Sequence, residues 1–387
     1  MTGANRRTFA LMAKPIGAVC NLRCAYCYYL DKQDALKQKP GGMSDRVLEA
    51  YIQQNFAVHG KNAVVEFVWH GGEPTLRSLD FYRQALRLQR KYGAGRKILN
   101  TLQTNGTLLD DVWCAFFAKN RFLIGVSIDG PKNLHDRYRT DANGGSFGRT
   151  MAGIRLLKKH GVNCNTLTTV NAMNWEYPEE VYGFLRDFSD FMQFLPVVET
   201  VCPQFEKEEG LRFAMPPGIH SSMIMHPLTD FSVPAGGYGR FLCGVLNEWK
   251  KRDFGKIHVM IFEATVGNML QKPAGLCVHE PLCGHSASIE ANGDVYSCDR
   301  YAFSAYKLGN ILETPLGELM EKNRSFGMNK MCGLPEECLY CPYIKLCFGG
   351  CPKDRIMFSR DGQPGKNYLC ESYKLFFKHF TKTMRIA

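Results

Sequence analysis

Apolar and polar positions follow two alternating periods along the first two thirds of the chain. Short apolar stretches typical of strands are each followed by a stretch with helical spacing. The expected strands are residues 8–17, 63–71, 97–105, 122–130, 162–170 and 191–199. The expected helices are residues 44–59, 79–92, 110–120, 147–160, 178–188 and 238–252.

Six strand-then-helix units predict an α/β fold with a parallel sheet and helical crossovers. Six is two units short of a full barrel, so a curved partial barrel and an open doubly wound sheet both fit. Either fold gathers functional loops at the C-terminal ends of the strands. Cys20, Gly71, Asn105 and Asp129 follow four of these strands. We therefore expect one shared site at that edge.

The remaining third has a different character. Residues 200–237 contain five prolines and no clear period, which predicts a long loop that acts as a lid or contacts substrate. Nine of the sixteen cysteines lie after Gly275. We therefore expect two domains, a partial barrel over residues 1–237 and, over residues 238–387, a linker helix plus a metal-stabilised cysteine-rich domain.

Composition narrows the class of protein. The chain has 387 residues and a net charge of +11, but Lys and Arg are spread out and form no basic run, so nucleic acid is not an expected partner. No apolar segment is long enough to span a membrane, and no segment has the pattern of a secretory signal. We expect a cytoplasmic protein whose cysteines are reduced or bound to metal.

The stretch CNLRCAYCYY, residues 20–29, carries three cysteines and no fourth nearby. Thiolates bind zinc or iron–sulfur clusters. Three thiolates on a four-iron cubane leave one iron open to a small molecule. A zinc site with a distant fourth ligand and a set of buried free cysteines are the alternatives. At the C-terminus, CLYCPYIKLCFGGC would on its own also fit a zinc ribbon, which is a nucleic-acid-binding module in some proteins.

The first loop resembles the radical S-adenosylmethionine (radical SAM) signature, with Tyr26 at its aromatic position. The resemblance implies a [4Fe–4S] cluster on Cys20, Cys24 and Cys27 and a partial (β/α)6 barrel. It also implies cleavage of S-adenosylmethionine to a 5′-deoxyadenosyl radical that abstracts hydrogen from a substrate carbon. The residues that it assigns to cofactor binding are Gly71, Gly72 and Glu73 of HGGEP, Asn105 of QTNG, Ser127 of SIDGP, and Arg139.

Together with that loop, the tail resembles the SPASM extension, a domain with two auxiliary [4Fe–4S] clusters. The resemblance assigns Cys277, Cys283, Cys298 and Cys351 to the first auxiliary cluster. It assigns Cys338, Cys341, Cys347 and Cys370 to the second. Three clusters and S-adenosylmethionine are then the expected cofactors.

Over nearly its whole length the chain is similar to anaerobic sulfatase-maturating enzymes, through segments such as WHGGEPTL, VSIDGPKNLHDRYR and NGDVYSCDR. These oxidoreductases convert an active-site Cys or Ser of a sulfatase to Cα-formylglycine. The resemblance implies Asp299 as general base, Tyr29 near the substrate, a sulfatase segment Cys/Ser-x-Pro/Ala-x-Arg as substrate, and a flavodoxin- or ferredoxin-type electron donor. Whether the target is cysteine or serine stays open.

A second radical SAM activity fits the same motifs. Other enzymes with this extension form thioether or carbon cross-links on peptides, and many carry an N-terminal domain for a leader peptide. Only nineteen residues precede Cys20, which favours sulfatase maturation.

Overall fold

The computed structural model describes residues 9–30, 32, 36, 41–217 and 225–385. Its main feature is a ten-stranded sheet in the order β12-β11-β10-β1-β2-β3-β4-β7-β8-β9. These strands are β1 (Ala10–Ala13), β2 (Val65–Trp69), β3 (Ile98–Thr104), β4 (Leu123–Ser127), β7 (Cys164–Val170), β8 (Phe191–Pro196), β9 (His258–Val259), β10 (Ser286–Ile289), β11 (Asp294–Tyr296) and β12 (Lys307–Asn310). Two small hairpins pair β5 (Thr140–Asp141) with β6 (Gly144–Gly145) and β13 (Met357–Phe358) with β14 (Pro364–Lys366).

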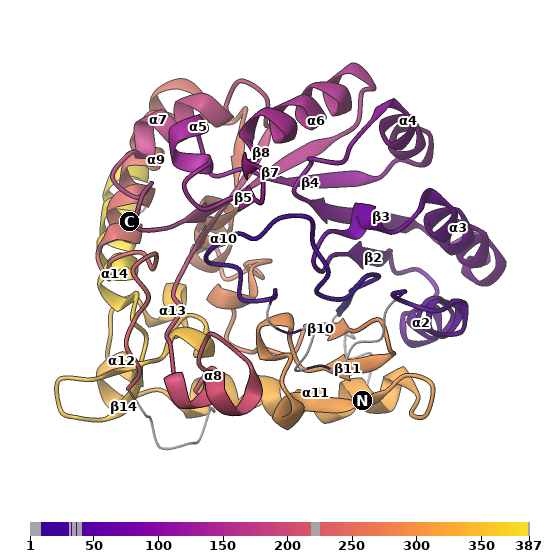
Figure 1. Cartoon of the computed structure of the whole chain (residues 1–387). Coiled ribbons are helices and arrows are strands. Elements are labelled where there is room, and N and C mark those ends of the chain that lie inside the picture. The colour runs from indigo at the N-terminus through magenta and orange to yellow at the C-terminus, as the bar shows by residue number, and fades with distance from the viewer. Residues whose placement is uncertain (1–8, 31, 33–35, 37–40, 218–224, 386–387) are drawn as a thin grey trace.

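The helices that follow the strands cover the outer side of the sheet, as Figure 1 shows for α2, α3, α4 and α6. The helices of the first two thirds are α2 (Asp45–Val58), α3 (Leu79–Gly93), α4 (Asp111–Asn120), α5 (Lys132–His135), α6 (Phe147–Lys159), α7 (Pro178–Leu185), α8 (Pro203–Glu209) and α9 (Gly237–Arg252). Those of the last third are α10 (Met260–Met269), α11 (Leu316–Cys332), α12 (Glu336–Leu339), α13 (Ile344–Cys347) and α14 (Cys370–Met384).

The six predicted strand–helix units are confirmed. Strands β1, β2, β3, β4, β7 and β8 run parallel to their neighbours. Local chemistry sets the helix starts: the side chain of Ser44 accepts a hydrogen bond from the Val47 amide, and that of Asp110 accepts one from the Trp113 amide. Buried and partly exposed side chains alternate along β2 and β3, so one face of each strand packs in the core. Because the two strands are parallel, both end at the same edge of the sheet.

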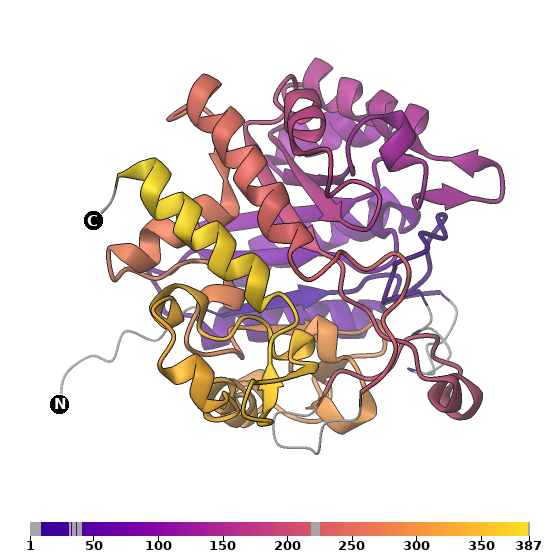
Figure 2. The same cartoon turned by 90° about the vertical axis from the view of Figure 1, so that its left-hand side faces the viewer.

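The C-terminal third is joined to the barrel more closely than the two-domain expectation implies. Strand β10 pairs in parallel with β1, and β11 and β12 extend the same sheet as antiparallel neighbours. Figure 2 shows α14 lying along α9, where the Ser372 hydroxyl accepts a hydrogen bond from the Gly239 amide at 2.8 Å. Strand β1 therefore lies inside the sheet, between residues of the two expected domains.

The described residues of the segment 200–237 contain more regular structure than the predicted long loop. They contain α8 and two isolated bridges, which pair Thr200 with Leu228 and Val201 with Phe213. Residues 218–224 lie outside the described residues. The segment returns to the barrel mouth, where it lines a pocket. None of the helices among the described residues combines the length and apolar character needed to cross a membrane.

Candidate active site

The three-cysteine loop follows β1 and lies at the expected sheet edge. The Cys27 amide donates a hydrogen bond to the Cys24 carbonyl at 3.0 Å. The amides of Arg23 and Ala25 donate to the carbonyls of Thr140 and Tyr138, which join the loop to the segment that contains Arg139. Burial raises the pKa of the Cys20 thiol to about 11 and that of Cys24 to about 12. The metal-free thiols therefore stay protonated, and bound metal has to displace those protons.

The HGGEP turn packs directly against the backbone that leads into Cys20. The Gly72 amide donates to the Gly17 carbonyl at 2.8 Å, and the Glu73 amide donates to the Val19 carbonyl at 2.9 Å. A Cβ on Gly72 would lie 2.0 Å from the Val19 carbonyl oxygen, and Gly71 has φ of +129°. Both glycines are therefore required by close approach and by backbone conformation.

Glu73 ties this turn to the end of β3. Its buried carboxylate accepts from the Asn105 amide at 2.8 Å and from the hydroxyls of Thr75 and Thr104 at 2.6 and 2.7 Å. The Asn105 side chain donates to Asn21 at 2.9 Å and lies 3.9 Å from the Cys20 sulfur. The Glu73 carboxylate is thus fully engaged by the protein, whereas Asn105 reaches the cysteine loop.

The last two predicted cofactor contacts are Ser127, the final residue of β4, and Arg139, which follows α5. The Ser127 hydroxyl accepts from Gln103 at 2.9 Å. The buried guanidinium of Arg139 pairs with Asp129, at 2.9 Å between Nε and Oδ2, and donates to Thr169 at 3.1 Å. The Tyr26 hydroxyl donates to the same Asp129 carboxylate. Arg139 is therefore fixed in position beside the cysteine loop.

Asp299 faces this loop from the C-terminal third. Its carboxylate accepts a hydrogen bond from the Tyr28 hydroxyl at 2.6 Å, and the Cys298 sulfur lies 3.5 Å from the other oxygen. The ammonium of Lys14 is 4.0 Å away. Burial would raise the pKa of Asp299, but the charges of Lys14 and Arg300 outweigh it and hold that pKa well below its usual range. Asp299 is thus an ionised carboxylate.

Lys14 and His70 complete the surroundings of this carboxylate. Lys14 is fully buried, and its ammonium lies 3.2 Å from His70 Nδ1. The same nitrogen accepts from the Gly71 amide at 2.7 Å. Burial, with the charge of Lys14, lowers the pKa of His70 to about 3. The ring is therefore neutral, with its remaining proton on Nε2.

The structure separates the two tyrosines after Cys27. Tyr29, the predicted substrate neighbour, is buried and donates to Glu290 at 2.6 Å. Tyr28 contacts Asp299 instead and lines a pocket. Sequence reasoning missed Tyr28 because the direction of each side chain in an irregular loop cannot be inferred from spacing.

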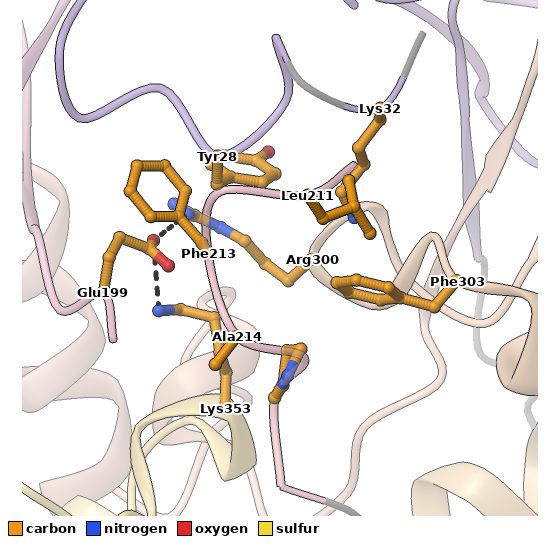
Figure 3. Close-up of a pocket in the computed structure, with 10 residues that line it drawn as sticks. Tyr28, Lys32, Glu199, Leu211, Phe213, Ala214, Arg300, Phe303 and Lys353 are labelled. Carbon is orange, nitrogen blue, oxygen red and sulfur yellow. Dashed lines mark hydrogen bonds and ion pairs between the residues drawn. The ribbon is translucent and has the colours of Figure 1, made fainter. Parts of the chain in front are cut away.

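The pocket beside Asp299 combines charged and aromatic walls (Figure 3). Its lining residues are Tyr28, Lys32, Glu199, Leu211, Phe213, Ala214, Pro216, Arg300, Phe303 and Lys353. Glu199 lies between two cations, 3.2 Å from Lys353 and 3.7 Å from Arg300. Arg300 also stacks on the Tyr28 ring at 4.0 Å. Barrel, C-terminal third and residues 211–216 therefore enclose one space.

Eight of the nine cysteines of the last third lie in two groups with the same members as the two sets that the resemblance implies, and Cys332 is in neither. The thiols of Cys277, Cys283, Cys298 and Cys351 lie close enough to interact electrostatically. Cys338, Cys341, Cys347 and Cys370 line one cavity together. In the described part of the chain, no three His, Cys, Asp or Glu side chains converge tightly enough for a single metal ion. Four thiols are the ligand number that a [4Fe–4S] cluster takes from protein.

Comparison with known proteins decides the family. The chain is 44% identical over 380 residues to the serine-type anaerobic sulfatase-maturating enzyme of Bacteroides thetaiotaomicron, covering 97% of this chain and 90% of that protein. The chain belongs to the anaerobic sulfatase-maturating enzymes. The cysteine-type anaerobic sulfatase-maturating enzyme of Clostridium perfringens is 32% identical over 98% of both chains.

Family and fold comparisons agree with this membership in the sulfatase-maturating group. The radical SAM superfamily matches residues 15–185, and SPASM, an iron–sulfur cluster-binding domain, matches residues 282–342. The solved structure of native anSMEcpe with bound AdoMet superposes with a TM-score of 0.82 at 31% identity, covering 97% of this chain and 98% of that one. Streptococcus suis SuiB, at a TM-score of 0.58 and 16% identity, shares the fold alone. The chain is therefore a radical SAM enzyme, and the cross-linking alternative is not favoured.

Proposed function

We propose that this enzyme oxidises a serine or cysteine of a sulfatase polypeptide to Cα-formylglycine. The observation that carries the proposal is the position of Asp299. An ionised carboxylate lies between the three-cysteine loop, through Tyr28, and the first auxiliary cysteine set, through Cys298. This is where a base is needed for an oxidation that removes both a hydrogen atom and a proton.

The cysteine groups fit three [4Fe–4S] clusters. Cys20, Cys24 and Cys27 would hold the cluster that binds S-adenosylmethionine at its open iron. The two auxiliary clusters would be held by Cys277, Cys283, Cys298 and Cys351, and by Cys338, Cys341, Cys347 and Cys370. When bound, these groups supply a 5′-deoxyadenosyl radical and carry single electrons.

The residues at the sheet edge would position S-adenosylmethionine. We assign this role to the backbone of Gly71 and Gly72, to the Asn105 and Ser127 side chains, and to Arg139. A guanidinium suits the methionine carboxylate. Glu73 would support the site from behind, because its carboxylate is buried and already accepts four hydrogen bonds from protein donors.

The proton of the substrate thiol or hydroxyl would pass to Asp299. Loss of hydrogen from the target Cβ leaves a carbon radical. When Asp299 accepts the S–H or O–H proton, a C=S or C=O bond forms and one electron is released, for which the first auxiliary cluster held beside Cys298 would be the acceptor. A thioaldehyde would then hydrolyse to the aldehyde. Lys14 and Tyr28 keep the carboxylate ionised and oriented for this step.

The pocket beside Asp299 would receive the sulfatase segment. Its aromatic walls suit an extended peptide segment, and its cations, Lys32, Arg300 and Lys353, are placed to contact carbonyl or carboxylate oxygens of that segment. We propose serine as the preferred target, because the relative at 44% identity is a serine-type enzyme, whereas the cysteine-type relative is 32% identical. A flavodoxin- or ferredoxin-type protein would supply the electron that is needed to cleave S-adenosylmethionine.

The test is an anaerobic assay of the reconstituted enzyme with reductant and S-adenosylmethionine. Peptides carrying Ser-x-Ala-x-Arg and Cys-x-Pro-x-Arg are compared by mass spectrometry, and 5′-deoxyadenosine is measured in the same samples. We expect formylglycine from both peptides, faster from the serine peptide. Abundant 5′-deoxyadenosine with both peptides unchanged would refute the proposed substrate and leave the radical chemistry intact.

A further inference from the structure

A fully buried lysine lies against the first auxiliary cysteine set. Lys330, near the end of α11, donates to the carbonyls of Cys277 and Val278 at 2.9 Å each and to that of Glu280 at 2.5 Å. These carbonyls belong to the segment that begins at Cys277 and leads to Cys283, two of the proposed ligands of the first auxiliary cluster. The lysine lies in no substrate pocket, and the proposed chemistry has not used it.

Hydrogen bonding identifies the charge state of this lysine. An ammonium has three N–H donors, and Lys330 has three carbonyl acceptors. A neutral amine would direct its lone pair at one of those oxygens. The geometry favours the charged form.

Arg355 continues the same arrangement toward the second set. Its buried guanidinium donates to the Lys330 carbonyl at 2.6 Å, to the Gly349 carbonyl at 3.2 Å and to the Phe348 carbonyl at 3.3 Å. Its charge acts on Cys351 and Cys283 of the first set and on Cys338 of the second. The Arg355 guanidinium is thus hydrogen-bonded to the backbone of Lys330 itself. Lys330 lies beside the first cysteine set, and Arg355 lies between the two sets.

We propose that Lys330 and Arg355 form a buried cationic pair that raises the reduction potential of the first auxiliary cluster, with Arg355 acting on the second as well. The inference rests on the cluster ligands proposed above. Four thiolates give a cluster a net negative charge, and adding an electron makes that charge larger. A fixed cation in a poorly solvated interior offsets the addition, so the reduced state is stabilised. The pair would make the first auxiliary cluster a better acceptor for the electron released by the substrate.

The test is an EPR-monitored redox titration of the reconstituted full-length enzyme. Cys20, Cys24 and Cys27 are replaced by alanine in all samples, so that the cluster that binds S-adenosylmethionine is absent and contributes no EPR signal. Lys330→Met keeps the length of the side chain and removes its charge. Asn323→Leu is the matched control: Asn323 is buried on the same helix and donates to the carbonyls of Gly284 and Ser297, beside Cys283 and Cys298, without a charge.

Lys330→Met should move one auxiliary potential to a more negative value, and Asn323→Leu should move neither. Unchanged potentials in Lys330→Met with full iron content would overturn the inference, as would an equal shift in Asn323→Leu. If Lys330→Met loses iron, Arg355→Lys and Arg355→Met decide. Arg355→Lys should keep both auxiliary potentials, and Arg355→Met should lower both. Equal potentials in these two Arg355 variants would overturn the inference. A parent protein without auxiliary clusters would overturn the ligand proposal itself.

Discussion

The contact between the HGGEP turn and the cysteine loop gives the sharpest prediction, through Gly72→Ala. The new Cβ would lie 2.0 Å from the Val19 carbonyl oxygen, 2.5 Å from the Val19 carbonyl carbon and 2.7 Å from the Ala18 carbonyl carbon. All three are backbone atoms, so no side chain can turn aside. Reaching ordinary contact at 3.4 Å requires about 1.4 Å of movement, and Val19 directly precedes Cys20.

A displacement of this size has two consequences. Overpacking should cost about 1–3 kcal/mol of stability. Moving a reacting group by about 1 Å costs on the order of 100-fold in rate. We therefore expect Gly72→Ala to fold and keep its auxiliary clusters, but to cleave S-adenosylmethionine on the order of 100-fold more slowly.

The assay measures 5′-deoxyadenosine formation without peptide, together with iron content and thermal unfolding. Gly148→Ala is the control, because a Cβ there meets no atom within 4 Å and Gly148 lies in α6. This control should cleave S-adenosylmethionine at the parent rate. A parent-like cleavage rate and iron content in Gly72→Ala would refute the claim that this contact positions the cysteine loop.

Three further predictions follow from single contacts. Asp299→Asn should lower formylglycine formation by at least about 100-fold, because the base is lost, and leave 5′-deoxyadenosine formation near the parent rate; a parallel loss of both products would contradict its role. Tyr28→Phe removes the 2.6 Å hydrogen bond to Asp299 and should lower formylglycine formation by about tenfold, measured by mass spectrometry, whereas an unchanged rate would show that Tyr28 does not orient the base. Asp253→Asn should cost about 2 kcal/mol at pH 7, since Arg186 and Tyr182 hydrogen-bond this carboxylate. Those partners hold the pKa of Asp253 below its usual value, so its contribution is present above the unfolded pKa and is lost as pH falls through the folded one; thermal unfolding should show the same deficit from pH 7 to pH 5 and a smaller one below pH 4.

The sequence was sufficient for the elements whose signals are local. The helices predicted at 44–59 and 110–120 are α2 and α4, and their caps, Ser44 and Asp110, lie directly before Asp45 and Asp111. The strand ends at Gly71, Asn105 and Asp129 converged because parallel strands with helical crossovers leave their C-terminal ends on one edge.

Long-range contacts were not accessible in the same way. Strands β10 to β12 are short, and β10 pairs with a strand more than 270 residues earlier in the chain, so no local pattern predicts the pairing. Lys14 carries no signal in the sequence that marks it as functional, yet it is the buried cation beside Asp299. Tyr28 and Tyr29 could not be ranked, because their roles depend on which way an irregular loop turns.

The pairing of β1 with β10 has a consequence for biosynthesis. While the chain emerges from the ribosome, β1 and β2 are made early and can pair with each other. The other edge of β1 stays unpaired until β10, Ser286–Ile289, has been synthesised. An edge strand left open exposes unpaired backbone groups that can pair with another nascent chain. Release of the barrel segment alone, by proteolysis or premature termination, should therefore yield aggregates rather than a smaller radical enzyme.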